Sequence, residues 1–126
     1  MSTERYEFFD VHPVNGVTVL RVRVPMIRQP QAAQDFGAEV RVAVQSHHPR
    51  ALLVDLAEVE YLSSTGFAVL LSLAKSITES GAAMALCGLQ EDVARGSSIL
   101  GLQRFVGIYE SEGQALDALS AEPNNE

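Results

Sequence analysis

The stretch that decides the fold is ALLVDLAEVEYLSSTGFAVLLSL, residues 51–73. It opens with an apolar run, 51–56, that contains one carboxylate, Asp55. Such a run is typical of a parallel strand buried on both faces of a sheet. The later apolar residues change to the three-and-four spacing of one helix face. They are Phe67, Leu70, Leu71, Ala74 and Ile77. The stretch therefore predicts a buried strand followed by a core helix.

Three hydroxyl side chains, those of Ser63, Ser64 and Thr65, precede Gly66 at the point where this helix should begin. One hydroxyl is enough to cap a helix, because its oxygen accepts a hydrogen bond from an unpaired amide of the first turn. The same amides and the positive end of the helix dipole would also stabilise a phosphate group. The residues alone leave two interpretations open, a plain helix cap and a phosphorylation site.

Strand and helix patterns alternate on both sides of this stretch. On the N-terminal side, Asn15-Gly16 predicts a hairpin, and Asp35 could cap a helix. The expected elements there are strands at 6–11 and 17–24, an irregular connection at 26–34 that contains Pro30, and a helix at 35–47. On the C-terminal side they are strands at 83–87 and 105–108, a short or mobile helix at 92–100, a helix at 112–121 and a frayed tail at 122–126.

This order of elements predicts one α/β domain for residues 1–126, with its core at about 6–121. We expect a mainly parallel sheet of four to five strands, an antiparallel first strand and about four helices. Cys87 falls in an apolar strand and has no second cysteine to pair with, so it is predicted to be a buried structural thiol.

The net charge of -7 is unevenly distributed along the chain. Residues 51–126 carry three Lys or Arg against eleven Asp or Glu. An acidic surface repels phosphate backbones, which argues against nucleic-acid binding and favours protein partners with basic patches. No apolar run reaches the roughly 20 residues that cross a bilayer, and the N-terminus lacks the layout of a signal peptide. We therefore expect a cytoplasmic protein without membrane insertion.

Motifs of catalysis are weak or missing in this sequence. Leu62 stands where the first glycine of a hydrolase Gly-x-Ser-x-Gly elbow should be. Ser72 and Lys75 match Ser-x-x-Lys, but no companion motif accompanies them. The histidines, the cysteine and the carboxylates show no metal-ligand spacing, and no glycine-rich nucleotide motif is present. The sequence predicts no enzyme, no cofactor and no metal.

Residues 55–71 resemble the central signature of STAS domains, the family of bacterial anti-sigma-factor antagonists. In that family a strand ending in Asp or Asn leads to an Asp-Ser-Ser/Thr-Gly motif and an apolar helix, and the serine two residues before the glycine accepts phosphate. That serine corresponds to Ser64, followed by Thr65 and Gly66. Further segments look like the family's next strand, its Leu-Gly-Leu-x-x-Phe turn and its closing segment, at 81–89, 100–105 and 108–116.

The chain departs from the family pattern at two positions beside the acceptor. Ser63 stands where the family usually has Asp. The segment 22–28 replaces the family's Gly-x-Leu-Asp and contains no acidic residue. Both carboxylates that flank the acceptor in the family are therefore absent here.

One apolar pair on the predicted helix is a candidate docking surface. If Phe67 faces the core, Val69 and Leu73 point away from it on a helical wheel. The alternative is that Leu73 packs under a neighbouring helix and only Val69 is exposed. The predicted partner-binding residues are Ser63, Ser64, Thr65, Gly66, Val69 and Leu73.

The resemblance implies a regulatory binding module. It would bind an anti-sigma kinase or a similar switch protein and release it on phosphorylation at Ser64, with Thr65 and Ser63 as second choices. The alternative is a constitutive STAS adaptor, a subunit of a larger assembly in which the hydroxyls only cap the helix. The oligomeric state stays open at this point.

Overall fold

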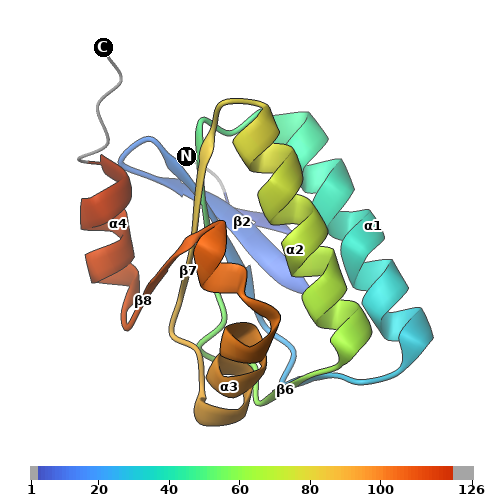
Figure 1. The fold of residues 1–126 in the computed structure, drawn as a ribbon. Coiled ribbons are helices and arrows are strands. Elements are labelled where there is room, and N and C mark those ends of the chain that lie inside the picture. Colours follow the sequence, from blue (N-terminus) through green and yellow to red (C-terminus); the bar gives the residue numbers. More distant parts are fainter. Residues whose placement is uncertain (1–2, 121–126) are drawn as a thin grey trace.

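The computed structural model describes residues 3–120, which form a mixed sheet with helices on both faces (Figure 1). The strand order is β1-β2-β3-β5-β7-β8. The strands are β1 (Glu4–Arg5), β2 (Phe9–Val14), β3 (Val17–Val22), β5 (Ala51–Asp55), β7 (Ala83–Cys87) and β8 (Gly107–Tyr109). The first three pair antiparallel and the remaining pairs are parallel, which confirms the predicted α/β class.

Four helices accompany the sheet, as predicted. They are α1 (Pro30–His47), α2 (Ser64–Glu79), α3 (Glu91–Leu100) and α4 (Glu112–Ser120), with a 3₁₀ turn at Leu102–Arg104. In Figure 1, α1 and α2 lie side by side on one face, whereas α4 lies on the opposite face. A second, two-stranded sheet joins β4 (Met26–Ile27) to β6 (Tyr61–Leu62) at the start of α2.

The position of β5 between β3 and β7 explains why its sequence is apolar up to Asp55. Leu52 and Val54 belong to the core beneath α1 and α2, whereas Leu53 belongs to the smaller core beneath α4. Alternate side chains of a strand point to opposite faces, so a strand covered on both faces needs apolar residues at both phases. Cys87 at the end of β7 is also fully buried, in the core beneath α4, which confirms the predicted structural thiol.

The N-terminal hairpin forms at the predicted turn, but its strands differ from the prediction. Asn15 and Gly16 both have positive φ, 52° and 82°, as the tight turn requires. The first hairpin strand is β2, Phe9–Val14, because Pro13 and Val14 pair with β3 instead of forming the turn. The sheet has six strands, not four to five, because two-residue β1 adds at one edge and β2 is paired along its full length.

The first helix starts earlier than predicted. It begins at Pro30, not at Asp35, and the preceding residue offers no side-chain cap. Proline suits the first helical position, because its missing N–H would have no partner there and its φ is already helical. The stretch predicted to be irregular therefore holds the first turn of α1 and also β4.

The C-terminal third also differs in detail. Helix α3 forms over ten residues although it contains Gly96. The ring of Phe67 packs against that glycine and leaves no room for a Cβ, which explains why glycine occupies the position. The last strand is Gly107–Tyr109, since the residues before it form the 3₁₀ turn. Helix α4 is described to Ser120, and the predicted last residue of this helix and the predicted tail lie outside the described residues.

Candidate functional site at the start of α2

Ser63 caps α2, and Ser63 alone does so among the three hydroxyl residues. Its backbone is extended, and its Oγ accepts a hydrogen bond from the N–H of Gly66 at 3.2 Å. The Phe67 N–H donates to the carbonyl of the same serine at 2.9 Å. Ser64 and Thr65 occupy the first turn and are exposed. The cap interpretation therefore accounts for one hydroxyl and leaves two without a structural task in the helix start.

The turn before α2 is held in place by the small sheet. Ile27 of β4 pairs with Leu62 of β6, and the Ser63 N–H donates to the carbonyl of Ile27 at 2.9 Å. Gly66 fits beneath this pair, because a Cβ there would lie 2.4 Å from Cδ1 of Leu62. Gly66 is buried, so its part in the site is to let the helix start pack against β6. This packing fixes the position of the first turn of α2, which contains Ser64.

A cation stands close to the position where the family pattern has a carboxylate. Arg28 follows β4 directly, and its guanidinium lies 5.9 Å from the ring centre of Tyr61 in β6. A shallow pocket of about 380 Å³ brings it together with residues of the β5–β6 connection and of α3. The lining residues are Met26, Arg28, Glu60, Tyr61 and Asp92. Charges of both signs therefore gather beside the small sheet of β4 and β6, which precedes α2.

Glu60 and Asp92 meet Arg28 in this pocket, and neither was predicted from the sequence. Glu60 ends the connection from β5 to β6, and its N–H donates to the carbonyl of Pro25, which brings it beside β4. Asp92 comes from the first turn of α3, 28 positions after Ser64 in the sequence. Only the docking of α3 beside β6 reveals this proximity, and no local pattern signals it.

Of the apolar pair on α2, Leu73 does not point away from the core. Leu73 is only 8% exposed and belongs to the core, because α1 covers this side of α2. Val69 is partly buried, and it packs against Gly37 of α1, where an added Cβ would lie 3.1 Å from Val69 Cγ2. The alternative interpretation of the pair is therefore the correct one for Leu73.

What remains accessible on this side of α2 is a groove against α1. Its section nearest the acceptor turn has a volume of about 360 Å³. Thr65, Ala68, Val69 and Ser72 line it from α2, and Gly37, Val40 and Arg41 line it from α1. Thr65 thus belongs both to the acceptor turn and to the end of the groove.

The carboxylate that ends β5 has a different environment from Ser64. Asp55 is 8% exposed, and its Oδ1 accepts a hydrogen bond from the Ala57 N–H at 2.9 Å. Its Oδ2 lies 3.8 Å from Nε of Arg21, which binds Glu112 of α4 at 2.8 Å. Burial raises the pKa of Asp55, and a hydrogen bond to Glu112 raises it further. This cluster fastens α4 to the sheet and does not form part of the α2 site.

Burial also decides the chemistry of the single cysteine beside this cluster. Cys87 is completely buried, and desolvation together with the negative charges of Asp55 and Glu112 raises its thiol pKa to about 12. A thiol with such a pKa is protonated at neutral pH and is a poor nucleophile. Within residues 3–120, no three histidine, cysteine or acidic side chains lie close enough together to hold a metal ion. None of the described helices is both long enough and apolar enough to span a bilayer.

Comparison with known proteins places this fold and turn in one family. The family model of the STAS domain matches residues 9–115, and the chain therefore belongs to the STAS domain family. An anti-sigma F factor antagonist of Paenibacillus polymyxa is 30% identical over 77 residues, which are 61% of this chain and 66% of that relative. The match thus spans slightly less than two thirds of the relative's length.

Solved structures agree with the family assignment at the level of the fold. A STAS domain protein of Planctomyces limnophilus superposes with a TM-score of 0.78 at 23% identity, covering 88% of this chain and 97% of that one. The anti-sigma factor antagonist SpoIIAA in its unphosphorylated form superposes with a TM-score of 0.73 at 14% identity, covering 92% and 99%. The chain has the STAS fold of anti-sigma-factor antagonists, as the resemblance implied.

Proposed function

We propose that this protein is a regulatory binding module whose partner is an anti-sigma factor, an anti-sigma kinase or a similar switch protein, and that phosphorylation of Ser64 releases that partner. The observation that carries the proposal is that different serines cap the helix and expose a hydroxyl at its start. Ser63 provides the cap, and the hydroxyl of Ser64 is exposed one position further along. The relative named above is an anti-sigma F factor antagonist, which supports this class of partner.

The surroundings of Ser64 are compatible with a phosphate group. A phosphorylated serine adds about 1.5 to 2 negative charges at neutral pH, and the positive end of a helix dipole favours charge of that sign. Arg28 follows β4, and β4 pairs with β6 directly before α2, so Arg28 is a candidate cation for the phosphate. Glu60 and Asp92, which share a pocket with Arg28, would compete for it. A partner that contacts the neutral turn would lose contact energy when the phosphate must be desolvated.

The proposed role is binding and not catalysis, and its place is the cytoplasm, where sigma factors and their regulators meet. In a partner-switching cycle, the unphosphorylated domain would hold the regulatory protein and the phosphorylated domain would release it. Thr65 and Ser63 are the second choices for the modified residue. Ser63 is the weaker of the two, because its Oγ already accepts the capping hydrogen bond.

A second function is favoured by the changes beside the acceptor. Ser63 and Arg28 stand near positions where the family pattern has carboxylates, and a kinase that reads those carboxylates would not find them. In this alternative the domain is a constitutive adaptor, a subunit of a larger assembly that Ser64 does not regulate. The two functions differ in one measurable property, the presence of phosphate on the chain in its own cells.

Intact-mass spectrometry of the protein purified from its native cells separates the two functions. We expect the wild type to carry one phosphate under growth or stress conditions, with the modified peptide mapped to Ser64. Ser64→Ala should abolish the added mass. Ser63→Ala is the matched control, because it should retain the phosphate and instead lose about 1 kcal/mol of stability through its missing cap. A chain free of phosphate under all conditions would leave the adaptor as the function.

A further inference from the structure

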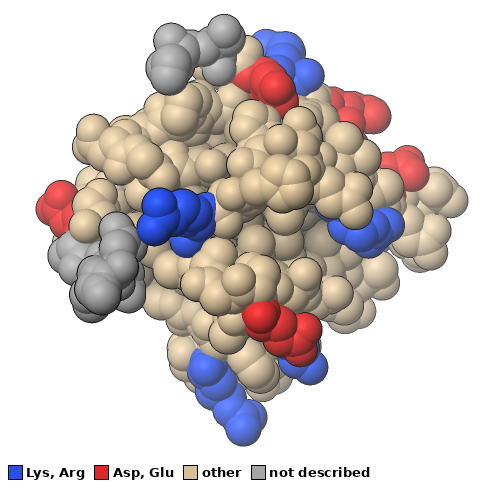
Figure 2. Space-filling model, turned by 90° about the horizontal axis from the view of Figure 1, so that it is seen from above, with Lys and Arg blue, Asp and Glu red and all other residues tan. Residues whose placement is uncertain are grey.

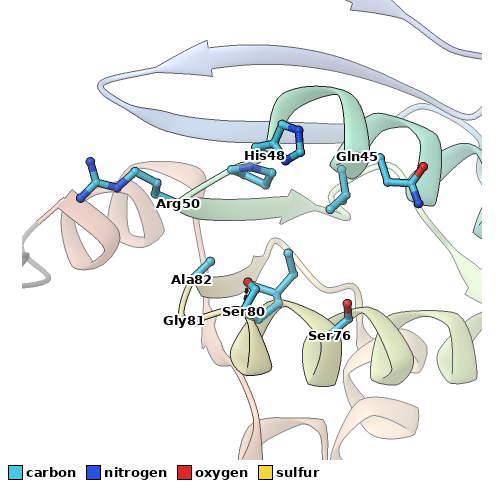
Figure 3. Close-up of a pocket in the computed structure, with 10 residues that line it drawn as sticks. Gln45, His48, Arg50, Ser76, Ser80, Gly81 and Ala82 are labelled. Carbon is cyan, nitrogen blue, oxygen red and sulfur yellow. Dashed lines mark hydrogen bonds between the residues drawn. The ribbon is translucent and has the colours of Figure 1, made fainter.

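A groove runs along the seam between α1 and α2, and it has two sections. The first, described above, starts at Thr65. The second has a volume of about 690 Å³ and lies where both helices end (Figure 3). Both sections share Val44, Gln45 and Ser76, so the groove is continuous from the acceptor turn to the far end of the helices.

The length of the groove matches that of a short helix. Its wall on α2 runs from Thr65 to Ser80, which is about 22 Å at the 1.5 Å rise per residue of an α-helix. The accessible apolar surface comes from Ala68, which is exposed, and from the partly buried Val44 and Val69. The core residues Val40, Leu73 and Ile77 lie beneath them. Figure 3 shows Gln45 and His48 on one side of the second section, with Ser76 and Ser80 on the other. A helix of three to four turns would lie along this length.

The charge of the groove is opposite to the charge of the protein. The net charge of the whole chain is -7, yet none of the described carboxylates is among the residues that line either section. The ionisable lining residues are Arg41, His48 and Arg50, all exposed. Neither arginine forms an ion pair with another described residue. Their guanidinium groups are therefore free to meet carboxylates of a partner.

Figure 2 shows the end of the molecule where the second section opens. The middle of this view is uncharged and hollowed, and acidic and basic side chains lie around it. Arg50 lies at one end of the section with its side chain directed outward in Figure 3, and Arg41 lies further along α1 toward the acceptor turn. The two arginines therefore mark two separate points along the groove, which suits a ligand with several negative charges along its length.

We propose that the groove between α1 and α2 binds an acidic amphipathic helix of the partner protein. Its apolar side chains would contact the floor, and its Asp or Glu side chains would pair with Arg41 and Arg50. This local preference differs from the expectation drawn from total charge, which favours basic partner surfaces. The proposal rests on the proposed function for the kind of partner, a regulatory protein, and adds the segment that it uses.

The same arrangement connects the groove to regulation. Thr65 lines one end of the groove and is the neighbour of Ser64 in the sequence. A phosphate on Ser64 would place like charge beside the end of an acidic helix. Like-charge repulsion would then weaken binding without any rearrangement of the domain.

A photo-crosslinking residue introduced at Ala68 tests the occupant in the native cells. Ala68 is exposed and lines the groove, whereas the exposed Ala38 of α1 does not line it and is the matched control. We expect position 68, and not 38, to crosslink to a partner segment that is amphipathic as a helix and carries Asp or Glu on its polar face. A basic segment, a second copy of this chain or the absence of any crosslink would overturn the proposal.

A peptide with the sequence of the crosslinked segment then tests the charge pairing. Arg41→Glu and Arg50→Glu should each weaken its binding about tenfold, as expected for a reversed charge at a polar contact. Arg104→Glu makes the same charge change outside the groove and should leave affinity within about twofold. Equal weakening by all three would indicate a nonspecific charge effect and would reject the assigned groove.

Different measurements test the phosphorylation switch at Ser64 and the groove between α1 and α2. The unmodified chain should crosslink at position 68 under conditions in which it carries no phosphate, because the groove does not depend on the phosphate. A chain without phosphate in cells that still crosslinks to an acidic helix would disprove the switch and retain the groove. A phosphorylated chain that never crosslinks at Ala68 would retain the switch and disprove the groove.

Discussion

Arg21 and Glu112 lie 91 positions apart in the sequence, yet Nη2 of Arg21 is 2.8 Å and 2.9 Å from the two carboxylate oxygens of Glu112. The pair connects the end of β3 to the first turn of α4, and Asp55 of β5 lies beside it. A carboxylate in the first turn also interacts favourably with the helix dipole. The two residues therefore fix the position of α4 on its face of the sheet.

Replacement of Glu112 by Gln should lower stability at neutral pH and not in acid. Burial alone would raise the pKa of Glu112, but hydrogen bonds from Asp55 and Arg21 outweigh burial and lower it. The ionised form therefore stabilises the fold above the ordinary pKa of 4.5, and this contribution is lost as pH falls through the lowered value. We expect a loss of about 1 kcal/mol at pH 7, since the pair is partly exposed.

Urea unfolding of Glu112→Gln and wild type across this pH range measures the difference. Glu110→Gln is the matched control, because Glu110 is exposed and pairs with no cation among the described residues. Its stability should stay within about 0.5 kcal/mol of wild type. A loss for Glu112→Gln that is independent of pH would show that side-chain shape, not charge, accounts for the effect.

Asp55→Asn should have the opposite pH dependence. The pKa of Asp55 is raised, first by burial and then by its hydrogen bond to Glu112, so its ionisation costs stability in the folded protein. That cost is absent below the ordinary pKa of 3.8 and grows as pH rises through the raised value. An asparagine cannot ionise, and its amide can still donate to Glu112.

The difference in unfolding free energy between Asp55→Asn and wild type should therefore shift in favour of the variant as pH increases. Arg21, Asp10, His12 and Cys87 are the other ionisable groups that interact with this cluster. Measuring Asp55→Asn in the Glu112→Gln background provides the control, because the shared hydrogen bond is then altered in both chains. A variant that loses stability as pH rises would contradict the raised pKa.

The sequence predicted the elements that local pattern determines. The boundaries of β5 and β7 follow from apolar runs, and the packing face of α2 follows from its three-and-four spacing. The burial of Leu73 could not be read from α2, because it depends on where α1 crosses. Two-residue β4 and β6 exist only because they pair with one another, and neither sequence alone has a strand signal.

The candidate site was predictable to the same extent. Ser63, Ser64, Thr65 and Gly66 form a continuous stretch, so its place at a helix start was accessible from the sequence. The charged pocket beside β4 and β6 was not, because Arg28, Glu60 and Asp92 come from three different parts of the fold. The groove was not predictable either, because its lining residues come from both α1 and α2 and it exists only where the two helices pack together.

Gly96→Ala should destabilise the fold although alanine is the better helix former. A Cβ at position 96 would lie 2.6 Å from two ring atoms of Phe67, which is itself buried and cannot move away freely. Overpacking of this kind costs about 1 to 3 kcal/mol, more than the roughly 1 kcal/mol that alanine gains in helix propensity.

The matched control for this change is Gly113→Ala in α4. The nearest atom to a Cβ at position 113 is Ser111 Oγ at 3.9 Å, so alanine fits there without a clash. Thermal unfolding should show a lower midpoint for Gly96→Ala and an unchanged or higher one for Gly113→Ala. If both variants shift upward, α3 can move away from α2 without cost, and the contact of Phe67 with Gly96 does not hold it.

Ser97→Ala should raise the stability of the protein. Ser97 is 1% exposed, and its Oγ has no hydrogen-bond partner among residues 3–120. A buried hydroxyl without a partner costs about 1 to 3 kcal/mol, because it has given up water and gained nothing in return. Alanine removes that cost and leaves the backbone of α3 unchanged.

The neighbouring Ser98→Ala makes the same change in helix propensity at an exposed position and isolates the contribution of burial. We expect Ser97→Ala to exceed Ser98→Ala by about 1 kcal/mol in urea unfolding. Equal effects would mean that the hydroxyl of Ser97 is satisfied in solution, and the core beneath α3 would then contain a polar partner for it.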